Sequence, residues 1–189
     1  MNYLAHAFLS PPHNEIFIGN MLGDFVKPNQ KSNYSASMRE GFTLHQKIDQ
    51  YTDAHDLVKA SVAIFKPQFL LSGGIFVDIL FDHFLANDER YFTGESLKSF
   101  CESVYDRIHA HKHVMNDRMK FFFGHMIEGD WLYSYKFKEG LYKSLRGICK
   151  RYPKLGDPEI AITYILKNEE VLLSKYYEYF PLLQSEVKT

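Results

Sequence analysis

One stretch indicates the fold class of this chain: Gly73-Gly74-Ile75-Phe76-Val77-Asp78-Ile79-Leu80-Phe81-Asp82-His83-Phe84-Leu85-Ala86. Apolar residues surround this predicted helix on every side, which is typical of a helix buried inside a domain. Asp78 and Asp82 are four residues apart, so their carboxylates point the same way and repel each other. Burying them is unfavourable unless a cation, an arginine or lysine, or the N-terminus of another helix compensates their charge.

Helical patterns continue over most of the remaining sequence. Asn14 could cap a helix that ends near Phe25, followed by a loop from Lys27 to Ser35. Further helices are predicted at Ser37–Ala54, from Asp56 to an interruption at Pro67, at Gly74–Asn87, from Thr93 to His111, at Asn116–Glu128, at Asp130–Arg151, and from Asp157-Pro158 to Phe180-Pro181. Strand signals are weak, so we predict a single compact all-α, multi-helix domain over residues 1–189.

Composition excludes several classes of protein. The formal net charge of −1 gives no general attraction to nucleic acid or anionic membranes. Only two cysteines occur, without zinc-binding spacing, so neither a thiolate zinc site nor a disulfide framework is expected. The N-terminal sequence lacks the features of a signal peptide, and no apolar run is long enough to span a bilayer. We therefore expect a soluble cytoplasmic protein that binds neither nucleic acid nor membrane.

A second group of polar residues follows a helical repeat. His45, Asp49 and Asp53 are spaced four residues apart and form one stripe of the helix predicted at Ser37–Ala54. Imidazole and carboxylate ligands suit Mn²⁺, Fe²⁺, Mg²⁺ or Zn²⁺. A solvated helix face explains the same stripe without a metal. Asp24, at the end of an apolar helix, and His6, among apolar residues, are further candidates, although a lone buried histidine often only completes a core.

Several motifs together resemble the acyl carrier protein phosphodiesterase family, which is related to the HD-type metal-dependent phosphohydrolases. They are Asn2-Tyr3-Leu4-Ala5-His6, Gly19-Asn20-Met21-Leu22-Gly23-Asp24-Phe25-Val26-Lys27, Leu44-His45 with Ile48-Asp49 and Thr52-Asp53-Ala54-His55, and Gly74-Ile75 with Asp78 and Asp82-His83-Phe84-Leu85-Ala86. The resemblance implies an HD-like helical fold and a divalent metal, typically Mn²⁺, with Mg²⁺ or Fe²⁺ as alternatives. It also implies hydrolysis of the phosphodiester that joins 4′-phosphopantetheine to an acyl carrier protein. The chain departs from the family pattern at Gln46, where an arginine usually follows the histidine.

From this resemblance we assign roles to individual residues. The predicted metal ligands are Asp24, His45, Asp78 and Asp82, and the predicted acid–base residues are Asp49 and His83. His6, Asp53 and His55 are candidates for further ligands or for groups that orient the ligands. Because a carrier protein is acidic, a basic docking surface is expected, for which the candidates are Lys112, Arg118, Lys143, Arg146, Lys150 and Arg151. Solvated helix faces explain the same cations without docking.

Two other functions remain open at this point. An HD-like hydrolase of a nucleotide or another small phosphodiester would keep the metal site without requiring a carrier protein. A non-enzymatic helical interaction module would use the carboxylates only to satisfy buried helix ends or arginines.

Overall fold

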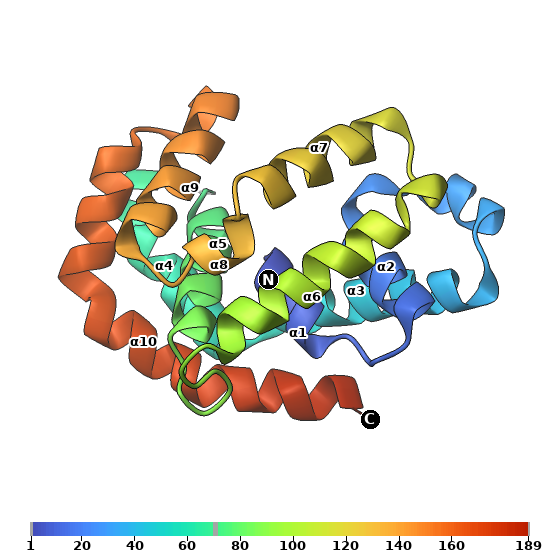
Figure 1. Cartoon of the computed structure of the whole chain (residues 1–189). Coiled ribbons are helices and arrows are strands. Elements are labelled where there is room, and N and C mark those ends of the chain that lie inside the picture. Colours follow the sequence, from blue (N-terminus) through green and yellow to red (C-terminus); the bar gives the residue numbers. More distant parts are fainter. Residues whose placement is uncertain (1, 70–71, 189) are drawn as a thin grey trace.

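The computed structural model describes residues 2–69 and 72–188. The α-helices of this part are α1 (Tyr3–Leu9), α2 (Asn14–Leu22), α3 (Ala36–Ala54), α4 (Asp56–Phe69), α5 (Gly73–Ala86), α6 (Ser96–Ala110), α7 (Asp117–Glu128), α8 (Trp131–Ser134), α9 (Lys138–Arg151) and α10 (Pro158–Lys188). Short 3₁₀ helices are η1 (Gly23–Phe25), η2 (Pro28–Asn33), η3 (Lys112–Val114) and η4 (Pro153–Leu155). No strand occurs in these residues, so the predicted all-α class is confirmed (Figure 1).

Helix α5 lies at the centre of the fold, against α1, α4, α9 and α10 (Figure 1). Phe76, Val77, Leu80 and Leu85, on different faces of this helix, are fully buried, whereas Ile75 at its N-terminal end is partly exposed and lines the cleft described below. This confirms the prediction of a buried helix at residues 73–86. Burial of such side chains is the main contribution to the stability of the domain, at roughly 1.5–3 kcal/mol each.

Helices α2 and α3 pack unusually closely, because glycines lie at their crossing. A Cβ atom on Gly19 would lie 2.1 Å from the Met38 carbonyl oxygen, and one on Gly41 would lie 2.2 Å from the Ile16 carbonyl oxygen. Glycine at both positions therefore allows the two backbones to touch. This contact brings the C-terminal end of α2 against the middle of α3, where His45 lies.

Two prolines lie inside helices where the sequence predicted that helices would end. Pro67 is part of α4, and Pro181 is part of α10, which continues to Lys188. A proline in a helix leaves the carbonyl group four residues earlier without its usual partner. In α10 that carbonyl belongs to Tyr177, and Arg90 donates a hydrogen bond to it at 3.4 Å. The predicted end of the last helix at Phe180-Pro181 was therefore wrong.

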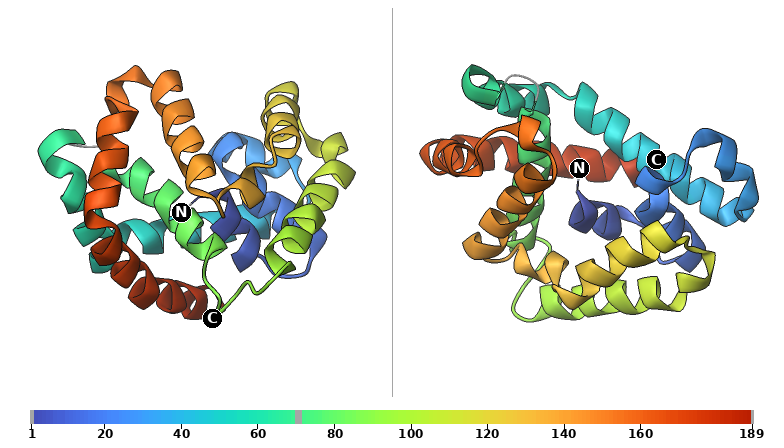
Figure 2. Two further views of the ribbon diagram at one scale, coloured as in Figure 1. Left: turned by 60° about the vertical axis from the view of Figure 1, so that its left-hand side comes forward. Right: turned by 90° about the horizontal axis from the view of Figure 1, so that it is seen from above.

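The segment from Asp130 to Arg151 was predicted as one helix but forms two. Asp130 has a left-handed φ of 46°, α8 ends at Ser134, and α9 begins at Lys138. A Cβ atom on Gly140 would lie 2.0 Å from the Ser134 carbonyl oxygen, so the start of α9 packs directly on the end of α8. As a result, α7 and α9 extend on opposite sides of α8 and α1 (Figure 2).

Three further differences from the expected elements concern the first part of the chain and the ends of helices. Helix α1 falls in a segment for which no helix was predicted, and η2 occupies most of the expected loop from Lys27 to Ser35. The helix predicted from Asn14 to Phe25 changes to 3₁₀ geometry at Gly23.

Among the described helices, none combines the length and apolar character needed to cross a membrane.

Candidate metal centre and active-site cleft

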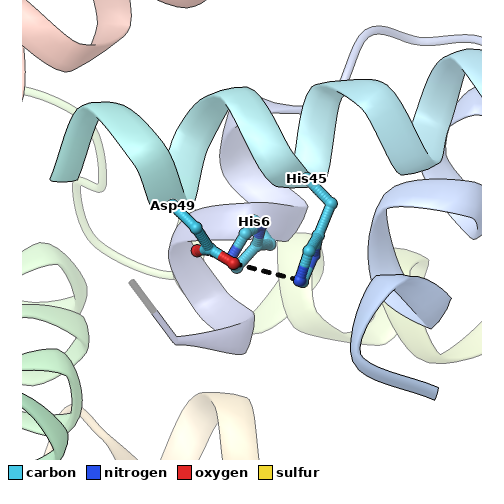
Figure 3. A group of neighbouring side chains, drawn as sticks. All are labelled: His6, His45 and Asp49. Carbon is cyan, nitrogen blue, oxygen red and sulfur yellow. Dashed lines mark hydrogen bonds and ion pairs between the residues drawn. The ribbon is translucent and has the colours of Figure 1, made fainter. Parts of the chain in front are cut away.

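Two histidines and an aspartate from two helices converge at one point (Figure 3). His6 comes from α1, and His45 and Asp49 come from successive turns of α3. One ligand atom from each lies within 4.8 Å of the others. The Asp49 carboxylate bridges the rings, with Oδ1 3.2 Å from His6 Nε2 and Oδ2 3.2 Å from His45 Nε2. The two imidazoles are stacked with their centroids 4.2 Å apart.

Asn20 of α2 fixes the orientation of both imidazoles. His6 Nδ1 lies 2.9 Å from the Asn20 side-chain oxygen, and His45 Nδ1 lies 2.8 Å from the Asn20 backbone oxygen. The Asn20 amide nitrogen donates to the His6 carbonyl and to Ser10, both at 2.9 Å, which sets the amide orientation. Because the two oxygens only accept hydrogen bonds, Nδ1 of each ring carries the hydrogen. The Nε2 atoms of both rings are therefore directed toward Asp49.

In this arrangement the Nε2 lone pairs of the two imidazoles face the oxygen lone pairs of Asp49, which is unfavourable unless a cation or an additional proton lies between them. Burial lowers the pKa of His6, against the opposing effect of its hydrogen bond with Asp49, so this ring is neutral at pH 7. Its Nε2 lone pair then faces a carboxylate oxygen. Burial would also lower the pKa of His45, but the nearby Asp24 and Asp49 carboxylates raise it to about 9. The donor set of two imidazole nitrogens and a carboxylate fits a divalent transition metal.

Asp24 and Tyr3 extend this group toward solvent. Asp24 Oδ1 lies 3.3 Å from His45 Nε2, and the Tyr3 hydroxyl donates to Asp24 Oδ2 at 3.1 Å. The hydrogen bond with His45 lowers the pKa of Asp24, so its carboxylate is charged. Burial would raise the pKa of Asp49, but its hydrogen bonds with His45 and His6 lower it well below the usual range. Two negative charges therefore lie next to the imidazoles at neutral pH.

A cleft of about 650 Å³ opens beside these residues. Its acidic lining residues are Asp24, Asp49, Asp53 and Asp78. Aromatic rings from α1, α7 and the α8 region line it as well, namely Tyr3, Phe122, Trp131 and Tyr135. Lys143 and Arg151 of α9 line the other side. The cleft therefore combines an acidic end, an aromatic wall and two cations, which suits a ligand with an apolar or neutral arm and an anionic group.

A family model described as "Acyl carrier protein phosphodiesterase" matches residues 1–183 of the chain. The chain belongs to this family. The acyl carrier protein phosphodiesterase of Photorhabdus laumondii is 25% identical over all of this chain and 96% of its own length. Those of Serratia proteamaculans and Yersinia enterocolitica are 26% and 28% identical, again over all of this chain and 98% of their own lengths. The predicted family is therefore confirmed, and with it the class of enzyme, a phosphodiesterase.

No solved structure matches this family member, so the HD-like architecture stays a prediction. Of the four metal ligands predicted from the family resemblance, Asp24 and His45 lie together, as described above. Asp78 lines the same cleft, and burial raises its pKa. Asp82 instead accepts hydrogen bonds from the Leu4 and Ala5 backbone N–H groups, at 2.7 and 3.1 Å. The N-terminus of α1 thus supplies the compensation that was one of the alternatives for a buried aspartate.

The predicted acid–base residues separate in space. Asp49 is part of the converging group, whereas His83 Nδ1 donates to the Tyr135 carbonyl oxygen at 2.6 Å and His83 does not line the cleft. Of the other candidates, His6 lies in the group and Asp53 lines the cleft. His55 lies at the end of α3, where its Nδ1 accepts the Leu57 N–H and its ring packs on Tyr179.

The predicted docking cations also have different surroundings. Lys143 and Arg151 line the cleft, whereas Lys112, Arg118, Arg146 and Lys150 do not. Arg146 forms a two-point contact with Glu159, at 2.6 and 3.1 Å. Arg118 lies over the Phe25 ring, 5.6 Å from its centroid.

Two residues of the candidate site, Asn20 and Tyr3, were not assigned a role from the sequence. A signal for Asn20 is available, because it is a polar residue in an otherwise apolar helix and is fully buried. Such a side chain requires hydrogen-bond partners, and here they are His6 and Ser10, while His45 bonds the Asn20 backbone oxygen. Tyr3 gives no comparable signal in the sequence.

Proposed function

We propose that this protein is a metal-dependent phosphodiesterase that releases 4′-phosphopantetheine from a holo acyl carrier protein. The observation that supports metal dependence most directly is the convergence of His6 Nε2, His45 Nε2 and Asp49, of which Asp49 lines the cleft. The names of the relatives support the carrier protein as substrate. The two free cysteines are buried and compatible with a reducing compartment, and we propose the cytoplasm.

His6, His45 and Asp49 would hold the ion, with Asp24 next to His45 as the nearest further carboxylate. Imidazole and carboxylate donors suit Mn²⁺, with Fe²⁺ and Mg²⁺ as alternatives. When bound, a divalent ion polarises a phosphoryl oxygen and lowers the pKa of a bound water. Asn20 would keep both Nε2 atoms free for this role, because it engages both Nδ1–H groups.

In the proposed hydrolysis, a water oxygen forms a bond to phosphorus while the bond from phosphorus to the carrier serine oxygen breaks. The serine oxygen takes up a proton, and 4′-phosphopantetheine leaves as a phosphomonoester. Asp53 and Asp78 line the cleft beside Asp49 and are the carboxyl groups placed to orient the water or protonate the serine oxygen. The aromatic wall formed by Phe122, Trp131 and Tyr135 would hold the pantetheine arm.

The carrier protein itself would bind at the rim of the cleft. Arg118 and Lys150 are exposed on α7 and α9, the helices on either side, and Lys112 precedes α7. Opposite charge on the carrier would increase the association rate and make it sensitive to salt. Arg146 is the weakest of the predicted docking residues, since Glu159 already neutralises it.

Incubation of the protein and Mn²⁺ with a holo carrier protein tests this function. We expect the carrier to lose the mass of the phosphopantetheine group, and chelation or the Asp49→Asn substitution to abolish the loss. Cleavage of bis(p-nitrophenyl) phosphate without cleavage of the carrier would instead favour a small phosphodiester as substrate. A protein that binds the metal but cleaves neither compound would favour a non-enzymatic interaction module.

Asp53→Asn is the matched control for Asp49→Asn. It makes the same chemical change one turn further along α3, at an exposed residue that lies outside the group of three. We expect Asp53→Asn to retain Mn²⁺ binding, measured by calorimetry, whereas Asp49→Asn loses it. Equal loss in both variants would contradict the assignment of Asp49 as a ligand.

A further inference from the structure

We propose that Lys143 and Arg151 on the cleft side of α9 form an anion-binding subsite for the phosphate-bearing arm of the substrate. This inference rests on the proposed function for the identity of the arm, 4′-phosphopantetheine. The chemical class that the subsite recognises is an organic phosphate attached to a neutral chain.

One face of α9 lines the cleft. Its residues follow the repeat of a helix: Gly140, Lys143, Ser144, Gly147, Ile148 and Arg151. Lys143 and Arg151 are eight residues apart, which places them about 12 Å from each other along the helix axis. Arg146 does not line the cleft and is paired with Glu159. The same helix therefore carries cations inside the cleft and a neutralised cation outside it.

Neither cation in the cleft has a carboxylate partner within salt-bridge distance among the residues that the structure describes. Arg151 lines the same cleft as Tyr3 of α1. Tyr3 in turn donates a hydrogen bond to Asp24 at the candidate metal centre. Arg151 thus lines the same cleft as Asp24 and Asp49 of the candidate metal centre, where the phosphate of the substrate would lie.

Arginine suits this position, because its guanidinium group can donate two parallel hydrogen bonds to a phosphate. Lys143, two turns earlier, would add a second positive charge to the cleft, at a greater distance from the phosphate. Gly147 lies between them, and a Cβ atom there would meet no other atom within 4 Å. The helix surface between the two cations is therefore open, and a thin chain could lie against it and opposite the aromatic wall.

Calorimetric titration with 4′-phosphopantetheine tests the subsite. The titration is made on metal-free protein, so that neither metal binding nor hydrolysis affects the result. We expect Arg151→Gln to weaken binding by about tenfold or more, the effect of losing a charged hydrogen bond. Lys143→Gln should weaken it by a smaller factor. Arg146→Gln is the matched control, with the same loss of charge on the same helix, and should bind as the wild type does.

A second variant separates the arm from the phosphate. Gly147→Leu adds a side chain in open space and should therefore fold normally, but it should hinder the arm. We expect it to weaken binding of 4′-phosphopantetheine and to leave binding of inorganic phosphate unchanged.

The subsite is refuted if Arg146→Gln weakens binding as much as Arg151→Gln, or if the wild type does not bind 4′-phosphopantetheine. Failure of the proposed function gives a different result. In that case the wild type binds the arm, and Arg151→Gln weakens this binding, but no carrier protein is cleaved in the presence of Mn²⁺.

Discussion

Substitution of Gly23 by alanine should disable the metal centre while the protein remains folded. Gly23 has φ −51° and ψ −42°, which alanine adopts without strain. A Cβ atom at this position would lie 2.2 Å from Cγ of His45, whereas ordinary contact begins at 3.4 Å. The imidazole would therefore have to move by about 1.2 Å. Such a shift far exceeds the tolerance of about 0.2 Å for ligand distances in metal sites.

The size of the effect follows from the role of His45. Loss of a supporting interaction around a metal ligand already weakens metal binding by about 10–100-fold. Displacement of the ligand itself should weaken Mn²⁺ binding by about 100-fold or more. Overpacking and the strained bond from His45 to Asn20 should reduce the free energy of unfolding by about 1–3 kcal/mol.

Calorimetric titration with Mn²⁺ measures this effect, with circular dichroism to verify folding. Gly124→Ala is the matched control, since a Cβ atom at Gly124 in α7 meets no atom within 4 Å. It should bind Mn²⁺ as the wild type does. A folded Gly23→Ala protein with the wild-type affinity for Mn²⁺ would refute ligation by His45.

Three further predictions concern the centre and its supports. Asn20→Ala removes the side-chain oxygen that holds His6 Nδ1–H but keeps the backbone carbonyl that holds His45, so it should change the ¹⁵N shifts of the His6 imidazole and leave those of His45 largely unchanged, whereas Asn20→Asp should retain Nδ1–H at His6; unchanged His6 shifts in Asn20→Ala would contradict the positioning role. Burial raises the pKa of Asp82 to about 7, so the folded state binds its proton more tightly than the unfolded state. The wild type should therefore lose stability relative to Asp82→Asn as the pH rises from about 4 to about 7. Urea titrations measure the free energy of unfolding of both proteins, and a gain in the relative stability of the wild type over this pH range would contradict the prediction. Mn²⁺ at about 100 times its Kd should stabilise the wild type by about 2.7 kcal/mol but not Asp49→Asn, and an equal rise in Tm of both proteins would place the ion elsewhere.

The sequence predicted most helices because the chain repeats apolar residues with helical spacing, and α5 is the clearest case. It did not predict that a helix continues through a proline, because this depends on a hydrogen-bond donor, distant in the sequence, for the carbonyl group that the proline leaves unpaired. The Tyr177 carbonyl that Pro181 leaves unpaired is satisfied by Arg90, which precedes it by 87 residues. The break between α8 and α9 likewise depends on the packing of Gly140 against Ser134.

Within the candidate site, the sequence indicated which residues share a helix face but not which faces meet. His45 and Asp49 were identifiable from their spacing on α3. The approach of His6 depends on the contact of α2 with α3 through Gly19 and Gly41, and on Asn20. Asp82 shows the same limit. The sequence predicts that this aspartate is buried, but it does not distinguish a metal from the N-terminus of α1 as the group that compensates its charge.

A crystal of the protein grown with Mn²⁺ and measured at an anomalous wavelength tests the proposed centre most directly. We expect one strong anomalous peak within coordination distance of His6 Nε2, His45 Nε2 and a carboxylate oxygen of Asp49. A peak elsewhere, or none at this position in a crystal soaked at saturating Mn²⁺, would contradict a metal centre built from α1 and α3.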